Sequence, residues 1–238
     1  MSLSSDMTMS QESPRTTHWD FAEGEVLFID KPLTWTSFDV VKKLKYQLKI
    51  KKIGHAGTLD PLATGLLILC TGKKTKQIEQ YQAQEKEYTG TLVVGKTTPS
   101  VDLETDFDSE RPIDHLTENE WEAARQSLTG EIQQVPPAHS AVQVNGQRAY
   151  KLARQGKEVA IKSRTVTIST FEFTRVALPE IDFRVVCTKG TYIRSLVRDL
   201  GEHLGVGAYL KSLCRTRIGE YTLADAHTID EFLSLVQV

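Results

Sequence analysis

Two long runs of alternating apolar and polar residues, at 164–176 and 181–188, constrain the fold of this chain more than any other feature. Successive side chains of a strand point to opposite faces, so such a run predicts a strand buried on one side. In the second run the inward face consists of Ile181, Phe183, Val185 and Cys187. Pro179 lies between the runs, which predicts adjacent antiparallel strands that turn near this proline.

A helix is predicted over 37–49 by its first turn and by its apolar spacing. Thr36 and Asp39 form a capping-box pattern, in which two side chains satisfy free backbone N–H groups at a helix start. The expected buried face, at helical spacing, consists of Phe38, Val41, Leu44 and Leu48. Lysines then occupy the outer face of this helix.

Four further elements complete the predicted fold. Helices are expected at 117–129, with a Thr117 and Glu120 capping box, and at 195–204. Short strands are expected at 25–29 and 88–94. Because strands and helices mix without a regular βαβ alternation, we predict an α+β fold with a mixed, largely antiparallel central sheet flanked by helices and loops.

The composition fits one folded domain that follows a tail. Of the 238 residues, 39% are hydrophobic and 25% are charged, which excludes a wholly disordered chain. Residues 1–20 are polar and lack apolar periodicity, so a disordered tail is predicted there. Residues 21–238 are predicted to form a single domain.

Several classes of protein are disfavoured. The longest apolar run, Leu66 to Cys70, is far shorter than the roughly 20 residues that span a bilayer. No basic start precedes an apolar stretch at the N-terminus, so no secretion signal is predicted and a cytoplasmic location is expected. The three cysteines are widely spaced and lack CxxC or CxxH company, so we expect neither a disulfide framework nor a metal site.

The net charge of −2 conceals three blocks of opposite sign. Residues 40–80 carry nine Lys and two acids, a net +7, and residues 140–220 carry fourteen Lys or Arg and seven acids, again +7. Between them, residues 101–131 hold ten acids and two Arg, a net −8. This pattern predicts a basic face for a polyanion and a separate acidic surface, although charge runs are also typical of ordinary solvated faces.

The segment 51–66 is the one most suited to chemistry. Gly54 and Gly57 permit close approach of the backbone to a ligand. Asp60 precedes Pro61, which favours an extended conformation at Asp60 and keeps its carboxylate out of a helix. Taken alone, an Asp before Pro is more often a turn or cap residue than a catalytic acid.

Residues 54–65, GHAGTLDPLATG, closely resemble the catalytic motif of the tRNA pseudouridine synthase B (TruB) family. Five other blocks resemble family motifs in the same order along the chain, so the resemblance covers about residues 24–221. These blocks are Asp30-Lys31-Pro32, Lys86-Glu87-Tyr88, the segment from Ser140 to Gly156, Lys189-Gly190-Thr191-Tyr192-Ile193-Arg194-Ser195-Leu196, and Leu213-Cys214-Arg215-Thr216-Arg217-Ile218-Gly219.

The resemblance implies the pseudouridine synthase catalytic fold and a specific reaction. The family converts uridine to pseudouridine in the TΨC loop of tRNA, at position 55, after flipping the base out of its stack. The reaction breaks the C1′–N1 bond, turns the uracil, joins C1′ to C5 and removes the C5 proton, so no cofactor is needed. The expected partner is the TΨC stem-loop of tRNA, and a stand-alone monomer without an obligate protein partner is expected.

The resemblance also implies roles for particular residues. Asp60 matches the catalytic aspartate, Arg194 the arginine that pairs with it, and Tyr88 the tyrosine that stacks on the target base and is a candidate for taking the C5 proton. The expected substrate-binding residues, beside Tyr88, are His55, which would fill the space left by the flipped base, and Tyr192, Leu213, Lys31 and Asp102. Whether the aspartate attacks the sugar, attacks the base or promotes formation of a glycal stays open.

The sequence departs from the family pattern at a few places. Many members carry a C-terminal PUA RNA-binding module, for which the residues after Tyr221 leave no room, so weaker tRNA binding is expected. Cys214 stands where Arg is common, and His139 lies where the family often has Tyr, as a substitute polar contact or as a surface residue. Pro99 stands where Asp is common, which weakens the match at Asp102.

Two alternative functions were weighed against the family reaction. A non-catalytic RNA-binding or tRNA-folding protein on the same scaffold would not need Asp60, Tyr88, Tyr192 and Arg194 together. An N-glycosyl hydrolase with Asp60 as nucleophile normally needs a second carboxylate, and the motif blocks offer no obvious one.

Overall fold

The fold is built on one long mixed sheet. The computed structural model describes residues 19–140, 142–144, 146–149, 152, 155 and 160–236. Its main sheet has nine strands. Seven of them lie in the order β1 (Val26–Lys31), β3 (Ala63–Thr71), β12 (Ala208–Ile218), β4 (Lys86–Val94), β11 (Glu180–Cys187), β10 (Arg164–Ala177) and β7 (Gly130–Gln134). β12 and β3 pair in parallel and the other neighbours are antiparallel, which confirms the α+β class with a mixed, largely antiparallel sheet.

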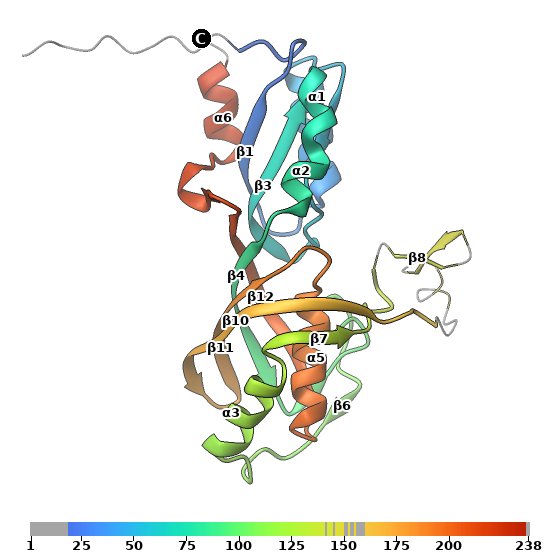
Figure 1. The fold of residues 1–238 in the computed structure, drawn as a ribbon, viewed down its shortest axis with the longest axis vertical. Coiled ribbons are helices and arrows are strands. Elements are labelled where there is room, and N and C mark those ends of the chain that lie inside the picture. The colour runs from blue at the N-terminus through green and yellow to red at the C-terminus, as the bar shows by residue number, and fades with distance from the viewer. Residues whose placement is uncertain are drawn as a thin grey trace, which may run out of the picture.

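Short strands extend this sheet and form two hairpins. β2 (Ile53–His55) pairs with β3, and β13 (Tyr221–Thr222) pairs with β12. The hairpins are β5 (Lys96–Thr97) with β6 (Ser109–Glu110), and β8 (Gln143–Val144) with β9 (Gln147–Arg148). β8 projects from the body beside the middle of the molecule (Figure 1).

The helices cover the two ends of an elongated molecule (Figure 1). At one end, α1 (Ser37–Gln47), α2 (Ile78–Ala83) and α6 (Ile229–Val236) accompany β1 and β3, together with the 3₁₀ turns η1 (Gly72–Gln77) and η2 (Leu223–Asp225). At the other end, α3 (Glu118–Ser127) and α5 (Ile193–His203) accompany β7, β10 and β11. β4 and β12 run through the middle, and β12 contributes to two of the three hydrophobic clusters, with Leu210 in one and Ile218 in another.

The principal predicted elements are confirmed. β10 and β11 form the expected antiparallel pair, with Phe173 opposite Phe183 and the turn between Ala177 and Glu180. Thr117 and Glu120 form their capping box at the start of α3. The helix expected at 195–204 begins two residues earlier, at Ile193, which places Arg194 in its first turn.

One expectation about α1 is wrong. Thr36 and Asp39 cap the helix as predicted, and Val41 and Leu44 are buried. Phe38, however, is 67% exposed. The buried stripe is occupied one residue earlier by Ser37, whose side chain bonds to Leu59, and Phe38 is turned about 100° away from it around the helix.

Several elements were not predicted. β3, β12 and α6 belong to this group; β3 is buried over almost its whole length and shows no alternation. Residues 1–18 of the expected tail lie outside the described residues, whereas Trp19 packs edge-on against Phe232 of α6. In the part of the chain that the structure describes, no helix is long and apolar enough to cross a membrane.

Candidate active site

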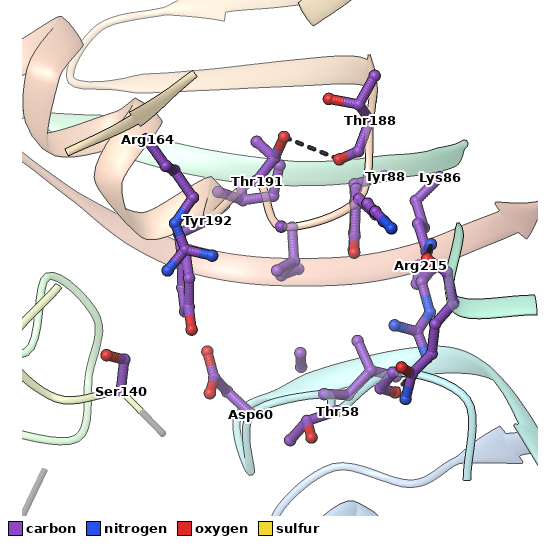
Figure 2. Close-up of a pocket in the computed structure, with 18 residues that line it drawn as sticks. Thr58, Asp60, Lys86, Tyr88, Ser140, Arg164, Thr188, Thr191, Tyr192 and Arg215 are labelled. Atoms are coloured by element: carbon purple, nitrogen blue, oxygen red, sulfur yellow. Dashed lines mark hydrogen bonds between the residues drawn. The ribbon is translucent and has the colours of Figure 1, made fainter. Parts of the chain in front are cut away.

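A cleft of about 530 Å³ opens at the middle of the molecule, where several of the predicted site residues meet (Figure 2). Its walls come from the loop after β2, from the central strands β4 and β12, and from the segment that leads into α5. Four of the predicted residues line it: Asp60, Tyr88, Tyr192 and Leu213. Residues distant in the sequence therefore face one space.

The loop that carries Asp60 is tied to the protein on both sides of this residue. On one side, the Leu59 N–H donates to Ser37 Oγ at 2.8 Å, and the Ser37 hydroxyl donates to the Leu59 carbonyl at 3.2 Å. On the other side, the Thr34 N–H donates to the Pro61 carbonyl at 2.8 Å. These bonds fix the backbone around Asp60 and leave its carboxylate facing the cleft (Figure 2).

Arg194 holds the Asp60 carboxylate from behind. Its Nε and Nη2 both lie 3.0 Å from Asp60 Oδ2. Its remaining donors reach the carbonyls of Ser100 at 3.0 Å and His139 at 2.8 Å. The Arg194 side chain is only 3% exposed while that of Asp60 is 41% exposed, so the pair presents the carboxylate and conceals the cation.

Asp102 lies behind this pair and is buried. Its Oδ2 is 3.7 Å from Arg194 Nε, and its Oδ1 accepts the Glu104 N–H at 3.0 Å. A substrate-binding role was expected for Asp102, but its described contacts are with Arg194 and its own loop. The geometry makes it a second counter-ion of Arg194.

The pKa of Asp60 is raised above that of an ordinary carboxyl group. The main cause is burial among protein atoms, and the negative charge of Asp102 acts in the same direction. The positive charge and hydrogen bond of Arg194 lower the Asp60 pKa and oppose these effects. Arg194 therefore favours the ionised form of the Asp60 carboxylate.

Tyr88 and Arg215 form the opposite wall. They are direct neighbours across the β4–β12 pairing, and the Tyr88 ring points into the cleft (Figure 2). Arg215 is 1% exposed and donates to the carbonyls of Leu66 at 2.8 Å and Gly57 at 3.1 Å. Burial raises the pKa of the Tyr88 phenol, whereas Arg215 beside it lowers that pKa.

Tyr192 faces Asp60 across the cleft (Figure 2). Its backbone is fixed by Gln134, which accepts the Tyr192 N–H at 2.8 Å and donates to its carbonyl at 3.1 Å. The Arg164 guanidinium lies over the Tyr192 ring at 5.2 Å from its centre. Together with Leu213, the rings of Tyr88 and Tyr192 give the cleft the flat, apolar surfaces that a planar base requires.

His55 and Lys31 lie beside the cleft rather than among its lining residues. His55 ends β2, and burial and the nearby Arg215 lower its pKa, so the imidazole is neutral at pH 7. Lys31 is fully buried, with its ammonium group bonded to the carbonyls of Pro32, Trp35 and Pro61. Burial lowers the Lys31 pKa to about 8, and the bond to Pro61 makes Lys31 a support of the Asp60 loop.

Two buried cations of the site were missed in the sequence. Arg215 and Lys86 both line the cleft, and burial lowers the pKa of Lys86 to about 8. Residues two apart on a strand lie on the same face, and this periodicity could have identified both side chains. It places Lys86 on the same face of β4 as Tyr88, and Arg215 on the same face of β12 as Leu213.

Two of the departures from the family pattern, His139 and Cys214, lie at the edge of the site. His139 is half-buried, and its carbonyl accepts a hydrogen bond from Arg194, so its backbone supports the ion pair. Cys214 is half-buried on β12, next to Thr64. Among the described residues, no group of three or more His, Cys, Asp or Glu side chains could hold a metal ion.

Comparison with family models gives two consecutive matches. Residues 45–193 match the model described as TruB family pseudouridylate synthase (N terminal domain). Residues 194–238 match the model described as tRNA pseudouridylate synthase B C-terminal domain. Together they span the cleft, α6 and the main sheet except for β1.

Curated relatives resemble the chain over nearly its full length. A protein named tRNA pseudouridine synthase B from Parabacteroides distasonis is 54% identical over 223 residues, covering 90% of this chain and 95% of the relative. One of the same name from Flavobacterium johnsoniae is 53% identical over 225 residues, covering 92% and 98%.

Solved structures resemble the fold as well. A chain in the crystal structure of a Cbf5-Nop10-Gar1 complex superposes with a TM-score of 0.69 at 29% identity, covering 90% of this chain. A chain in the structure of an H/ACA RNP bound to a substrate RNA containing 2′-deoxyuridine gives a TM-score of 0.67 at 26% identity, also covering 90%. The present chain spans about half the length of these solved chains, 54% and 53%.

Proposed function

Because the chain belongs to the TruB family of pseudouridylate synthases, we propose that it converts the uridine at position 55, in the TΨC loop of tRNA, to pseudouridine, with Asp60 as the catalytic carboxylate. The chain is a tRNA pseudouridine synthase and hence an isomerase. The position in the tRNA and the role of Asp60 are proposed here beyond what family membership states.

One observation carries the assignment of Asp60. The Asp60 carboxylate faces the cleft. The guanidinium of Arg194, which is only 3% exposed, bonds to it from the side away from the cleft. The arginine favours the ionised form of the carboxylate and holds it pre-oriented for attack. Among the described residues that line the cleft, Asp60 is the only acid, which disfavours hydrolysis by a pair of carboxylates.

The cleft accounts for the steps of isomerisation. A uracil that enters it lies between the rings of Tyr88 and Tyr192, with Leu213 on the apolar side. Asp60 then promotes cleavage of the C1′–N1 bond, and the stacked uracil turns in place before C1′ joins C5. Tyr88 is the candidate for accepting the C5 proton; burial raises its pKa, and the adjacent Arg215 opposes that rise.

Access to the cleft requires the target uridine to leave its stack, which costs a few kcal/mol. His55, neutral and beside the cleft, is proposed to fill the space that the base leaves. Lysines and arginines near the cleft, such as Lys189 and Arg164, would contact phosphates. We further propose a cytoplasmic monomer that needs no obligate protein partner.

A tritium-release assay tests the function. Unmodified tRNA labelled at uridine C5 is incubated with the purified protein, and the product is mapped by carbodiimide modification and primer extension. Release of one tritium per tRNA, with the new pseudouridine at position 55, is the expected result. Pseudouridine at another position would contradict the substrate assignment, and RNA binding without release would favour an RNA-folding protein on this scaffold.

A further inference from the structure

The outer face of α1 combines exposed aromatic rings with lysines. We define this α1 face by Phe38, Lys42, Lys45 and Tyr46 of α1 together with Lys49, which lies just after the helix; all five are exposed. Phe38 is 67% and Tyr46 82% exposed, so neither ring contributes to the core. A single exposed apolar residue is ordinary at a protein surface, whereas two large rings on one face form a patch that suits a partner.

The spacing brings these side chains into one stripe. Phe38, Lys42 and Tyr46 follow at intervals of four residues, which places them one above the other on a helix. The eleven residues of α1 extend over about 16 Å at 1.5 Å per residue. An open groove of about 600 Å³ lies beside Lys42 and Tyr46, and Trp35 also lines it.

The lysines of the α1 face are available to a partner. Among the ion pairs of the described residues, none involves Lys42, Lys45 or Lys49. The acid nearest in sequence, Asp39, uses its carboxylate to cap the helix at Thr36. The face therefore carries a net positive charge, of which Asp39 offsets a part near Lys42.

The α1 face begins next to the cleft. Ser37, the first residue of α1, exchanges two hydrogen bonds with Leu59, the residue before Asp60. Leu59 lines the cleft, and Phe38 follows Ser37 directly in the chain, so the helix that carries the α1 face is joined to the loop of Asp60.

We propose that the α1 face is an RNA-docking surface, on which Phe38 and Tyr46 stack with unpaired bases while Lys42, Lys45 and Lys49 contact phosphates. Stacking rings within a basic track are the combination by which proteins bind single-stranded nucleic acid. A protein partner of ordinary composition would not require three lysines without a described ion pair beside the two rings. The inference rests on the proposed function, because it takes the substrate tRNA as the occupant.

Binding of unmodified tRNA by full-length variants tests this inference. The double variant Phe38→Ala/Tyr46→Ala is expected to weaken tRNA binding about tenfold or more, because each stacked base contributes substantially to affinity. Turnover at saturating tRNA and the melting temperature are expected to stay unchanged, since both rings are exposed. The ring-conserving variant Phe38→Tyr/Tyr46→Phe is expected to bind like the wild type.

Phe107 offers a matched control. It is also an exposed aromatic residue, at 51%, but it lies in the acidic segment 101–131. Phe107→Ala is expected to leave tRNA affinity unchanged. An equal loss with Phe107→Ala would overturn the proposal, because it would show a general effect of removing surface rings.

The lysines are tested by the salt dependence of binding. Neutralising Lys42, Lys45 and Lys49 together with Gln is expected to reduce the slope of log K against log salt by about 2, at roughly 0.7 to 0.9 per phosphate contact. Unchanged affinity and slope in both multiple variants, with normal tritium release by the wild type, would overturn the docking surface and leave the proposed function intact. Absence of both tRNA binding and release in the wild type would overturn the two together.

Discussion

Arg194 Nε lies 3.0 Å from Asp60 Oδ2, although 134 residues separate the two in the sequence. The same guanidinium also bonds to the backbone carbonyls of Ser100 and His139, so it joins the Asp60 loop to the two segments that carry these residues. The position of the carboxylate thus depends on the planar, multi-dentate geometry of one buried side chain.

Arg194→Lys tests that dependence. Lysine keeps the charge but cannot reach Asp60 and both carbonyls with a planar fork, so the carboxylate loses its fixed position. We expect single-turnover pseudouridine formation to fall by about 100-fold, while tRNA affinity stays within about tenfold. Filter binding and rapid-quench measurements on one preparation distinguish the two effects. Wild-type turnover in Arg194→Lys would show that the fork is dispensable.

Asp102→Asn tests the electrostatics of the pair through the pH dependence of turnover. Asp60 acts when ionised, so activity falls as the pH drops through its pKa. The charge of Asp102 raises that pKa, so its removal is expected to shift the acid limb of the profile to lower pH. Asp106→Asn, at an exposed acid of the same loop, is the control and should leave the profile in place. A shift to higher pH in Asp102→Asn would contradict this account.

Much of the fold could be predicted from local patterns. The β10–β11 pair, the two capping boxes and the strand that carries Tyr88 follow from alternation and cap chemistry, and the structure confirms them. The central strands β3 and β12 could not be predicted in this way. β3 is buried on both faces, and β12 changes from buried to exposed and back along its length, so neither shows a clean period of two.

The sequence predicts which residues belong to the candidate site but not how they are arranged. It also does not reveal how deeply a lysine or an arginine is buried. Arg215 and Lys31 are among the largest fully buried side chains of the protein, yet lysine and arginine are almost always expected at the surface. Phe38 shows the converse error, since an apolar residue at helical spacing was placed in the core. In each case long-range contacts, such as that of Ser37 with Leu59, decide the outcome.

Arg215→Met tests the support of the Asp60 loop. The substitution leaves the buried carbonyls of Leu66 and Gly57 without their donor, and each unsatisfied group costs about 1–3 kcal/mol. We expect the free energy of unfolding, from urea titration, to fall by about 3 kcal/mol or more. Arg217→Met, on the same strand, removes a more exposed ion pair with Glu85 and should cost less than about 1 kcal/mol. Equal effects of the two substitutions would refute a special role for Arg215.

Tyr88→Phe tests proton transfer separately from stacking. The ring remains and only the hydroxyl beside Arg215 is lost, so tRNA affinity should be unchanged. We expect turnover to fall by about 100-fold, the lower end of the range for general acid–base catalysis. Tyr81→Phe, at a tyrosine that packs against Tyr221 away from the cleft, is the matched control. Full activity of Tyr88→Phe would remove its hydroxyl from the mechanism.

The most direct measurement compares tritium release by the wild type and by Asp60→Asn on the same labelled tRNA. Asparagine keeps the shape of the side chain and removes the negative charge. The account predicts that release by Asp60→Asn is undetectable while its tRNA affinity stays within about tenfold, or 1.4 kcal/mol, of the wild type. Release near the wild-type rate by Asp60→Asn would contradict the claim that the Asp60 carboxylate performs the isomerisation.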